Sequence, residues 1–448
     1  MTRTLALCLL LFCASAGAAE FGVYRSEAPA GPASVDAFEL WLGKSVQLAE
    51  AFEARDIWDN IDGAAWQLGP WSQWVRAKAG RNLVLSVPML PGTGGVSLAS
   101  CAAGQYDVYW RNLANELAYY GLHWAYLRLG WEMDGNWYAW GAPQGSGQEA
   151  NFAGCFRRIV TTMRATQPAS QWKFVWNPTA TWTDPAWLNA TWPGDAYVDL
   201  VGIDLYDQSW VQNTYPYPST CDSACRLARQ QTAWNTHAWY LQTMRNFAVT
   251  HGKPFALPEW GVVARTDGHG GGDNPYFIQK MYEFIADPAN YVQFSVLFDA
   301  NAPEANYNLS GLDAATAFPQ AAAKFRQLFA TVTAPTPTPA PVPVPVPAPA
   351  PTPAADATPP SVALGTPPAG TVIRRRSTVT MEASASDNVG VVAVEFSING
   401  RLACRVLTSP YRCSASVGNK NDTTYTLTAR ALDAAGNAAS YSRTYSAR

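Results

Sequence analysis

A proline-rich segment divides this chain into two parts. The stretch TAPTPTPAPVPVPVPAPAPTPAADATPP, from Thr333 to Pro360, alternates proline with small residues. Proline lacks an amide donor and has a fixed backbone angle, so this segment cannot form a helix or pair as a central strand. We expect it to be an extended, semi-rigid spacer. The sequence therefore predicts a domain over residues 20–332, a linker over 333–358 and a second domain over 359–448.

The first twenty residues, MTRTLALCLLLFCASAGAAE, have the pattern of an export signal. Arg3 precedes an apolar run, and small residues follow that run with the spacing that a signal peptidase accepts. We expect cleavage near Ala18 or Ala19, which makes residues 1–19 a signal peptide. The apolar run is too short for an ordinary membrane span. The expected location is secreted or periplasmic, with no membrane span.

Cysteine usage fits an oxidising compartment. Beyond the expected signal peptide, an even set of cysteines remains: Cys101, Cys155, Cys221, Cys225, Cys404 and Cys413. Such a set in an exported chain indicates disulfides, although sequence alone leaves their pairing open. We prefer Cys221 with Cys225, Cys404 with Cys413, and Cys101 with Cys155. The histidines are scattered and no second metal-ligand pair accompanies CDSAC, so we expect no metal site and no cofactor.

Composition limits the class of partner. Hydrophobic residues make up 48% of the chain, charged residues 15%, and the formal net charge is -3. These values offer no basic surface for nucleic acid. The chain also lacks a G-x-G-x-x-G turn after its first expected strand and a P-loop anywhere, which argues against nucleotide binding. We expect an uncharged or small partner and a monomeric protein.

The larger domain alternates strands with helices. Helical stretches such as DVYWRNLANELAYYG, NFAGCFRRIVTTMRA and NPYFIQKMYEFIAD repeat apolar residues every three or four positions. They lie between short apolar stretches that we interpret as strands: FGVYR, DIWDNI, NLVLSVPML, HWAYLRLGWEM, WKFVWNP, YVDLVGIDLYD, PFALPEWG and VQFSVLFD. Eight such units favour a closed (β/α)8 TIM barrel. A doubly wound open sheet is the alternative.

Two glutamates stand where a barrel of this kind carries its chemistry, at the carboxyl ends of strands. Glu132 ends the fourth expected strand, and Glu259 ends the seventh. These strands lie across the barrel mouth from one another, so the two side chains can converge. Retaining glycosidases place two carboxyl groups about 5 to 5.5 Å apart, one as nucleophile and one as proton donor. Repulsion between such close acids raises the pKa of one of them.

Aromatic residues are concentrated in the same domain. All 19 tryptophans fall between Trp41 and Trp260, and many follow expected strand ends. Sugar rings present C–H faces that pack on indole, so a cleft lined in this way suits a sugar chain. Others, such as Trp41, Trp110 and Trp239, are expected in barrel packing. The candidate substrate-binding residues are Arg128, Trp131, Trp137, Trp140, Trp176, Asn177, Tyr206 and Trp260.

The fourth-strand segment resembles a known family. RLGWEMDGNWYAWG is similar to the R-x-x-x-E-M-N-G-x-W-Y-x-W motif of glycoside hydrolase family 26, the β-mannanase family of clan A. FVWNP, VDLVGIDLYD and LPEWG resemble that family's fifth-strand, sixth-strand and nucleophile segments. The resemblance covers roughly Phe21 to Ala330. It implies a retaining (β/α)8 enzyme in which Glu132 is the acid/base and Glu259 the nucleophile.

The same resemblance implies roles for neighbouring residues. Tyr206 would donate a hydrogen bond near the nucleophile, and Arg128 would be a charge partner beneath the site. Trp137 and Trp140 would contact sugar. Asp204, in GIDLYD, is either a cleft residue or a buried structural acid.

The chain departs from the family pattern next to the acid/base. Trp131 stands where many members have histidine, and Asp134 where they have asparagine. The eighth strand offers Phe298 and Asp299 where clan A enzymes often supply a tryptophan platform. Changed polar neighbours alter which sugar hydroxyls are satisfied. The expected function is a secreted retaining endo-β-1,4-mannanase. Glucan, xylan or exopolysaccharide hydrolysis, or polysaccharide binding without catalysis, are the alternatives.

The segment after the linker has a different pattern. It alternates polar and β-branched residues between regular turn signals, which is typical of an all-β sandwich. SDNVGVVAVEFSINGRLA and LTARALDAAGNAA resemble bacterial immunoglobulin-like modules. Asn399 and Gly400 suit a tight hairpin turn, and Cys404 and Cys413 could bridge the strands that follow. The module has no tryptophan, which favours a spacer or adhesion role over a stacking carbohydrate-binding face.

Overall fold

A computed structural model describes residues 19–180, 184–330, 358–406, 409–417, 424–433 and 437–448. The chain divides into two compact units, Met1–Thr336 and Pro337–Arg448. The expected signal peptide and linker lie outside the described residues, apart from Ala19 and Thr358. Among the described residues, no helix combines the length and the apolar character that crossing a membrane requires.

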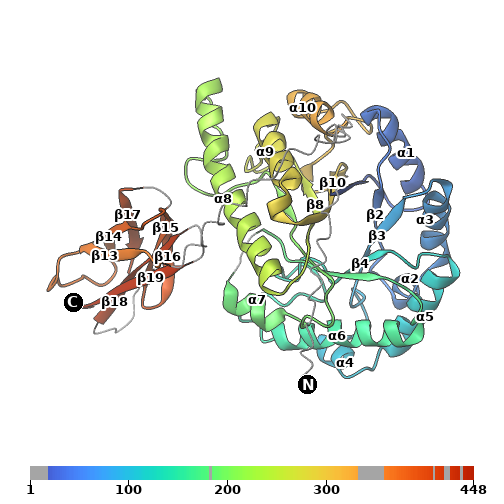
Figure 1. The fold of residues 1–448 in the computed structure, drawn as a ribbon, viewed down its shortest axis with the longest axis horizontal. Coiled ribbons are helices and arrows are strands. Elements are labelled where there is room, and N and C mark those ends of the chain that lie inside the picture. The colour runs from blue at the N-terminus through green and yellow to red at the C-terminus, as the bar shows by residue number, and fades with distance from the viewer. Residues whose placement is uncertain (1–18, 181–183, 331–357, 407–408, 418–423, 434–436) are drawn as a thin grey trace, which may run out of the picture. The chain divides into compact units, whose positions relative to one another are not determined.

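The first unit is a closed parallel barrel (Figure 1). Eight strands run in the order β10-β1-β2-β3-β4-β5-β6-β8 in the described part of the chain, and β10 pairs in parallel with both β1 and β8 to close the ring. The short β7 (Leu205–Tyr206) also pairs with β8. The barrel strands are β1 (Glu20–Tyr24), β2 (Leu48–Phe52), β3 (Asn82–Val87), β4 (Tyr126–Leu129), β5 (Lys173–Trp176), β6 (Leu200–Gly202), β8 (Phe255–Gly261) and β10 (Val292–Phe298). The TIM-barrel prediction is confirmed.

One expected strand was wrong. DIWDNI contains the short helix α2 (Trp58–Ile61), and the second barrel strand is the earlier stretch LAEAF, Leu48–Phe52. Two aspartates and an asparagine leave DIWDNI too polar for a strand enclosed on both faces. LAEAF is less obvious in the sequence because Glu50 interrupts its apolar run. In the structure Glu50 is fully buried and points into the barrel, where it has a charge partner.

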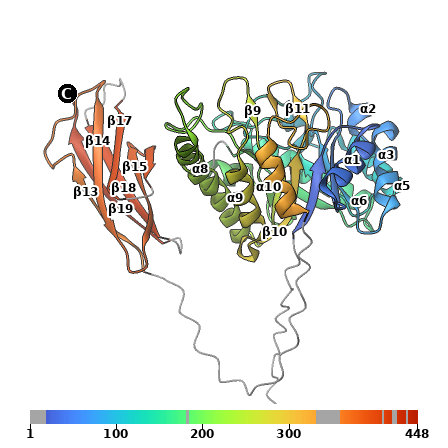
Figure 2. The ribbon, with the colours of Figure 1, turned by 90° about the horizontal axis from the view of Figure 1, so that it is seen from above.

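Helices surround the barrel, as Figures 1 and 2 show. Several begin with an Asp or Asn side chain that accepts a hydrogen bond from a free backbone amide, as Asn274 does from Phe277 at the start of α9. The helices are α1 (Gly31–Leu42), α2 (Trp58–Ile61), α3 (Ala65–Ala77), α4 (Leu98–Ala102), α5 (Asp107–Tyr119), α6 (Glu149–Thr166), α7 (Pro185–Thr191), α8 (Ser223–Thr250), α9 (Pro275–Ala286), the 3-10 helix η1 (Pro288–Asn290) and α10 (Pro319–Phe329).

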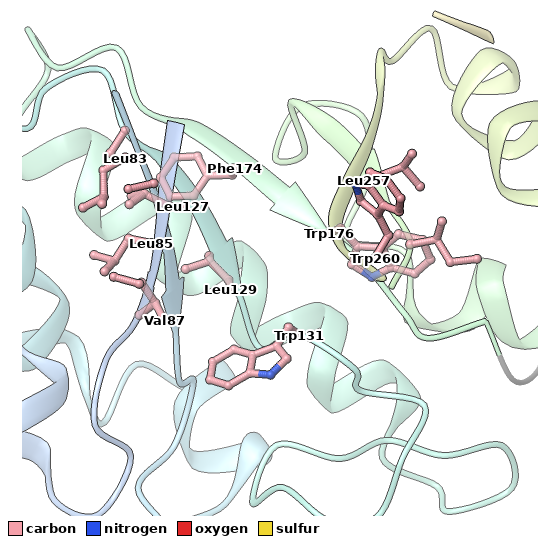
Figure 3. Close-up of a cluster of buried hydrophobic side chains, with 14 of the residues drawn as sticks. Leu83, Leu85, Val87, Leu127, Leu129, Trp131, Phe174, Trp176, Leu257 and Trp260 are labelled. Atoms are coloured by element: carbon pink, nitrogen blue, oxygen red, sulfur yellow. The ribbon is translucent and has the colours of Figure 1, made fainter. Parts of the chain in front are cut away.

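The outward faces of the strands form the main core against these helices. Strand residues alternate between the two faces, so every second apolar side chain meets a helix. Figure 3 shows this layer, with side chains of β3 beside those of β4 and with Trp131, Trp176 and Trp260 included. Because the packing is continuous around the barrel, the strand ends are held rigidly. A rigid frame is what a site built on those ends requires.

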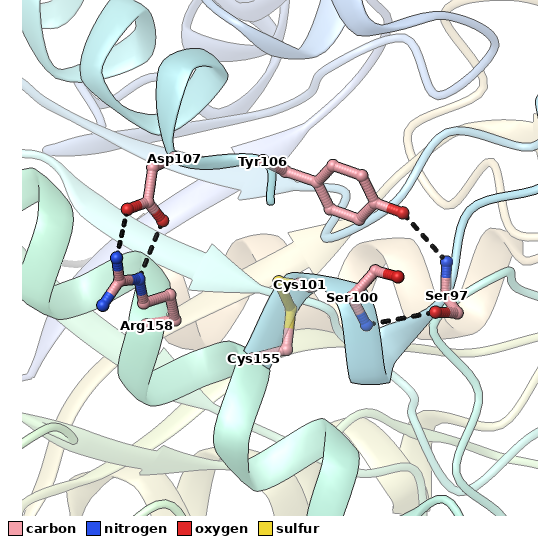
Figure 4. Close-up of a disulfide and its surroundings, with 7 residues drawn as sticks. All are labelled: Ser97, Ser100, Cys101, Tyr106, Asp107, Cys155 and Arg158. Carbon is pink, nitrogen blue, oxygen red and sulfur yellow. Dashed lines mark hydrogen bonds and ion pairs between the residues drawn. A yellow bond between two sulfur atoms is a disulfide. The ribbon is translucent and has the colours of Figure 1, made fainter. Parts of the chain in front are cut away.

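Two disulfides lie in the barrel unit. Cys101 of α4 is bonded to Cys155 of α6, and beside them Asp107 accepts a hydrogen bond from Arg158 (Figure 4). The second joins Cys221 to Cys225 at the start of α8. With the Cys404–Cys413 bridge of the second unit, the structure forms the three pairs preferred from the sequence.

The small sheet of β9 (Ala264–Arg265), β11 (Asn301–Ala302) and β12 (Ala305–Asn306) follows the ends of β8 and β10. Figure 2 shows β9 and β11 at the upper end of the barrel. That end is therefore the one at which the carboxyl ends of the parallel strands meet.

The second unit is a sandwich of two antiparallel sheets, as expected. One sheet has the order β13-β14-β17 and the other β16-β15-β18-β19. Asn399 and Gly400 both have positive φ and connect β15 to β16 in a tight hairpin. Cys404 lies on β16 and Cys413 on β17, so their disulfide crosses between the sheets. The strands are β13 (Ser361–Thr366), β14 (Thr378–Ser386), β15 (Val391–Ile398), β16 (Arg401–Val406), β17 (Tyr411–Ser416), β18 (Thr424–Asp433) and β19 (Ala438–Ser446).

Candidate active site

The barrel interior changes from apolar to charged along its strands. Its lower layer is a compact apolar cluster: Leu48, Val84, Tyr126, Val175, Leu200, Ala256, Phe294 and Val296. Two positions further along, where the side chains again point inward, four of these strands carry polar residues: Glu50, Ser86, Arg128 and Asn177. A polar layer therefore lies above the apolar one, toward the carboxyl ends.

Arg128 is the centre of that polar layer and is completely buried. Its Nη1 donates to Glu50 Oε1 at 2.9 Å and to Glu259 Oε1 at 2.5 Å. Its Nη2 pairs with Asp204, and its Nε donates to Asn177 Oδ1 at 2.8 Å. Burying a charge is costly unless it is paired, and here one guanidinium serves three carboxyl groups. Arg128 thus lies beneath the candidate site as a charge partner.

A β-bulge directs Glu259 into the barrel. Ser295 pairs with Leu257 and Leu297 pairs with Trp260, so two residues of β8, Pro258 and Glu259, lie opposite one residue of β10. Regular alternation would place Leu257 and Glu259 on the same outward face. The extra residue reverses the pattern, and Trp260 packs outward while Glu259 points inward. Pro258 suits the bulge because it has no amide hydrogen to contribute to the sheet.

The Glu259 carboxyl is held at both oxygens. Oε1 accepts from Arg128, and Oε2 accepts from the Tyr206 hydroxyl at 2.6 Å. The side chain is 6% exposed. Two donors, one of them charged, fix the orientation of this carboxyl group.

Glu132 is positioned by an unusual backbone path after β4. Gly130 has φ 56° and no room for a side chain, since a Cβ would lie 2.3 Å from Met89 Sδ. Glu132 itself has φ 53°, a left-handed conformation that costs a non-glycine residue on the order of 1 kcal/mol. Its amide donates to the Asn177 carbonyl at 3.1 Å, which stabilises this path. Strained backbone of this kind is concentrated at functional sites.

The two glutamates converge. Carboxylate oxygens of Glu132, Asp204 and Glu259 all lie within 4.8 Å of one another. Burial raises the pKa of Glu132 to about 8, with a further contribution from the negative charge of Glu259. Trp137 Nε1 donates to Glu132 Oε2 at 3.0 Å. The arrangement gives one carboxyl that keeps its proton near neutral pH beside one that is held by two donors.

Asp204 belongs to the buried structural acids rather than to an open cleft, since it is 2% exposed and paired with Arg128. Burial raises the pKa of its carboxyl well above the usual range. The three close carboxyls could be spanned by a cation, but Arg128 already donates to Asp204 and Glu259 as their counter-charge. Asn177 is also buried, and its Oδ1 orients Arg128.

Three predicted sugar contacts are wrong. Trp140, Trp176 and Trp260 have no exposed surface. Trp140 stacks on Tyr138, whereas Trp176 packs beside Phe247 of α8 and Trp260 beside Phe325 and Phe329 of α10. A tryptophan at a strand end can face either the barrel mouth or the helices, and sequence position alone does not separate the two.

Trp137 and Trp131 differ from these three tryptophans in their surroundings. Trp137 is 52% exposed beside Glu132, so its ring is available. Trp131 is only 3% exposed, but it forms part of the wall of a cavity and donates from Nε1 to the Tyr138 hydroxyl at 3.1 Å. On the eighth strand, Phe298 stacks on Tyr24, and Asp299 is buried in an ion pair with Arg25.

Sequence reasoning missed Glu50, which shares Arg128 with Asp204 and Glu259. A signal was present, because a lone acid within the apolar run LAEAF needs a buried partner if that run is a strand. Glu50 was not identified as a buried acid because the second strand was predicted at DIWDNI instead.

Comparison with known proteins agrees with this geometry. Residues 114–231 match the family model described as glycosyl hydrolase family 26, and residues 360–429 match the one described as bacterial Ig domain. The matched part of the barrel is thus similar to a glycoside hydrolase. Within that class, the resemblance to family 26 is confirmed, and a stretch similar to a bacterial Ig domain follows it.

Individual relatives are similar over shorter stretches. A mannan endo-1,4-beta-mannosidase from Bifidobacterium adolescentis is 28% identical over 162 residues, which cover 35% of this chain and 14% of that protein. Endoglucanase H from Acetivibrio thermocellus is 32% identical over 114 residues, 24% of this chain and 12% of that protein. The chain therefore matches only a small part of the length of these curated relatives.

A solved structure, GH26C from a Muricauda species, supports the fold. It has a TM-score of 0.50 and 16% identity, and the match covers 70% of this chain and 86% of that one.

Proposed function

We propose that this protein is a secreted retaining glycoside hydrolase that cleaves internal β-glycosidic bonds of a polysaccharide, with β-1,4-mannan as the first candidate. The observation that carries the proposal is the approach of the Glu132 and Glu259 carboxylate oxygens to within 4.8 Å. Retaining enzymes need about 5 to 5.5 Å between their carboxyl groups, whereas inverting enzymes need about 6.5 to 9.5 Å to admit a water molecule.

In the first step, Glu259 attacks the anomeric carbon as the bond to the leaving sugar oxygen breaks. Glu132 gives its proton to that oxygen, so the leaving group departs as a neutral alcohol. In the second step, Glu132, now a carboxylate, takes a proton from water. The water oxygen attacks the anomeric carbon and releases Glu259, which returns both groups to their starting states.

The surroundings suit these two roles. Arg128 and Tyr206 donate to the two oxygens of Glu259 and hold its carboxyl group in a fixed position, which is what an attacking nucleophile needs. Burial and the nearby charge of Glu259 raise the pKa of Glu132, and this keeps the proton that the acid must supply. The division between one carboxylate and one protonated acid is the pattern expected of a glycosidase pair.

The substrate proposal rests on the family and on the names of relatives. Among these relatives, one is called a mannosidase and one an endoglucanase, so mannan and glucan are the first polymers to test. Trp131, which stands in place of the usual histidine, keeps xylan and exopolysaccharide as further alternatives. Export is supported by the N-terminal pattern and by the three disulfides, which are typical of oxidising compartments.

The test is release of reducing sugar from mannan, glucan, xylan and an exopolysaccharide. We expect the wild type to release sugar from at least one polymer and Glu259→Gln to be slower by at least about 10⁴-fold. Glu283→Gln, which alters an exposed glutamate on α9, is the matched control and should keep full activity. Binding of a polymer without any release of sugar would instead support the noncatalytic alternative.

The anomeric form of the first product tests the mechanism separately. NMR of early reaction mixtures should show the β-anomer from a β-linked substrate, because two displacements restore the configuration. Initial release of the α-anomer would contradict the nucleophilic role of Glu259.

A further inference from the structure

A cavity of about 260 Å³ lies beside Trp131, the residue that precedes Glu132 in the sequence. Its walls come from the segments after β1, β2 and β4, and they include Trp131 and Tyr138, which lie on either side of Glu132 in the sequence. Phe52, also in the wall, lies 5.7 Å from the Arg128 guanidinium. The cavity therefore adjoins the place where the reacting sugar would lie.

The remaining lining residues combine a flat aromatic ring with groups that can pair with hydroxyls. Trp66 is 49% exposed, and its Nε1 donates to Asn60 Oδ1 at 3.2 Å, which orients the ring. Glu27 accepts from the Phe52 amide at 3.1 Å through Oε2. Arg55 is exposed and lies over the Tyr138 ring, 5.1 Å from its centre. An aromatic face with a few placed polar groups is the usual composition of a sugar site.

The wall of the cavity also contains an unpaired acid. Glu53 lines the cavity and is 2% exposed, yet neither of its carboxyl oxygens has a hydrogen-bond partner among the described residues. An unpaired buried carboxyl is costly, and a binding site is one place where such a cost is retained. Burial raises the pKa of Glu53 well above its usual range and that of Glu27 to about 7, so either group can donate a hydrogen as well as accept one.

We propose that this cavity is a subsite for one neutral pyranose unit of the substrate, next to the unit that reacts at Glu259. Trp66 packs on a face of that sugar, while Glu27 and Arg55 hydrogen-bond its hydroxyls. The proposal rests on the polysaccharide hydrolase function proposed above, and it identifies residues that set the preferred substrate.

Charge and size define the class of sugar. A hydroxyl donates and accepts, so it can satisfy Glu27 and Arg55 together. A uronic acid would place its carboxylate near Glu27 and Glu53, and an amino sugar would place its ammonium group near Arg55. A volume of about 260 Å³ is just below the roughly 300 to 1,000 Å³ of sites that enclose larger ligands, and it suits one ring.

The test uses oligosaccharides of increasing length from whichever polymer the wild type degrades. For the wild type, kcat/KM should rise steeply at the length that first fills the cavity. In Trp66→Ala and Arg55→Ala this rise should shrink by about tenfold or more, while shorter oligosaccharides are cleaved as before. Both residues are exposed, so replacing them should not prevent the protein from folding. Trp124→Ala is the matched control, since Trp124 is 66% exposed and precedes β4 at the opposite end of the barrel.

The outcomes separate this inference from the proposed function. If the wild type cleaves no polymer, the proposed function fails. If it cleaves oligosaccharides and both variants keep the wild-type dependence on length, the subsite is wrong. Faster cleavage of oligosaccharides that carry a uronic acid or a free amino sugar at this position would overturn the neutral assignment.

Discussion

In the barrel, Glu50, Arg128 and Asp204 lie enclosed between strands, whereas the interior of the C-terminal domain is built from side chains such as Met381 and Phe396. Among its described residues, the C-terminal domain buries one charged side chain, Asp433, which accepts hydrogen bonds from its neighbour Asn437. Both domains have a continuous apolar core. They differ in the number of charged side chains buried beside that core.

This difference indicates which part of the chain carries chemistry. A buried ion pair is often no more stabilising than apolar side chains of the same size, so packing alone does not explain the charge cluster around Arg128. The sandwich shows that this chain can build a core almost without charge. The cluster in the barrel is therefore best explained by its contact with Glu259, whose position it fixes.

The largest expected effect follows from removing the shared cation. Arg128→Met leaves Glu50, Asp204 and Glu259 without their counter-charge, which should lower the free energy of unfolding of the barrel by about 3 to 5 kcal/mol. Calorimetry of the full chain should show the barrel transition moving down while the C-terminal transition stays in place.

A surface arginine provides the control for that experiment. Arg164 pairs with Asp199 at 3.1 Å, but its side chain is 42% exposed. Arg164→Met should cost no more than about 1 kcal/mol. An equal loss of stability in the two variants would mean that the buried cluster contributes no more than an exposed ion pair.

The second prediction concerns the C-terminal domain. Its Cys404–Cys413 disulfide joins the two sheets and closes a loop with a sequence separation of 9. Replacing both cysteines by serine should destabilise that domain by about 2 to 3 kcal/mol, mainly because the unfolded chain gains freedom. Hydrolysis of a soluble oligosaccharide should be unchanged. A fall in kcat would show that the sandwich contributes to the site.

The third prediction separates catalysis from stability within the barrel. Tyr206→Phe removes the hydroxyl that donates to Glu259 Oε2 and should reduce kcat on the order of tenfold. Tyr307→Phe is the control, because Tyr307 packs against Tyr206 but its hydroxyl faces Glu304. Steady-state kinetics should distinguish them, with unfolding measured alongside. Equal effects on kcat would argue for a packing role only.

The sequence was sufficient for the barrel, the sandwich and the positions of Glu132 and Glu259. The regular alternation of strands and helices predicts the layers of the fold, and the ends of the strands predict where the mouth of the barrel lies. It was insufficient for Trp140, Trp176 and Trp260, because the face on which a strand-end side chain lies depends on local irregularities. The bulge at Pro258 and Glu259 is one of them.

The sequence was also insufficient to predict which charged residues pair when they lie far apart in the chain. Arg128 and Glu50 are 78 positions apart, and nothing local in either segment specifies their contact. The same holds for the cavity, whose walls come from segments after three different strands. Such features arise from the closure of the barrel, so they follow from the fold rather than from any single motif.

The smallest expected effect is a pH shift that depends on one hydrogen bond. Burial and the charge of Glu259 raise the pKa of Glu132 to about 8, so cleavage that needs this proton should decline as the pH rises through about 8. A substrate whose leaving group departs without protonation should show no such decline in its first step.

The indole of Trp137 donates to Glu132 and lowers its pKa, because the bond favours the ionised form. Trp137→Phe should therefore move the alkaline limb of kcat to higher pH while retaining an aromatic ring. A limb that moves to lower pH, or one that persists with the activated leaving group, would mean that the titrating group is not Glu132.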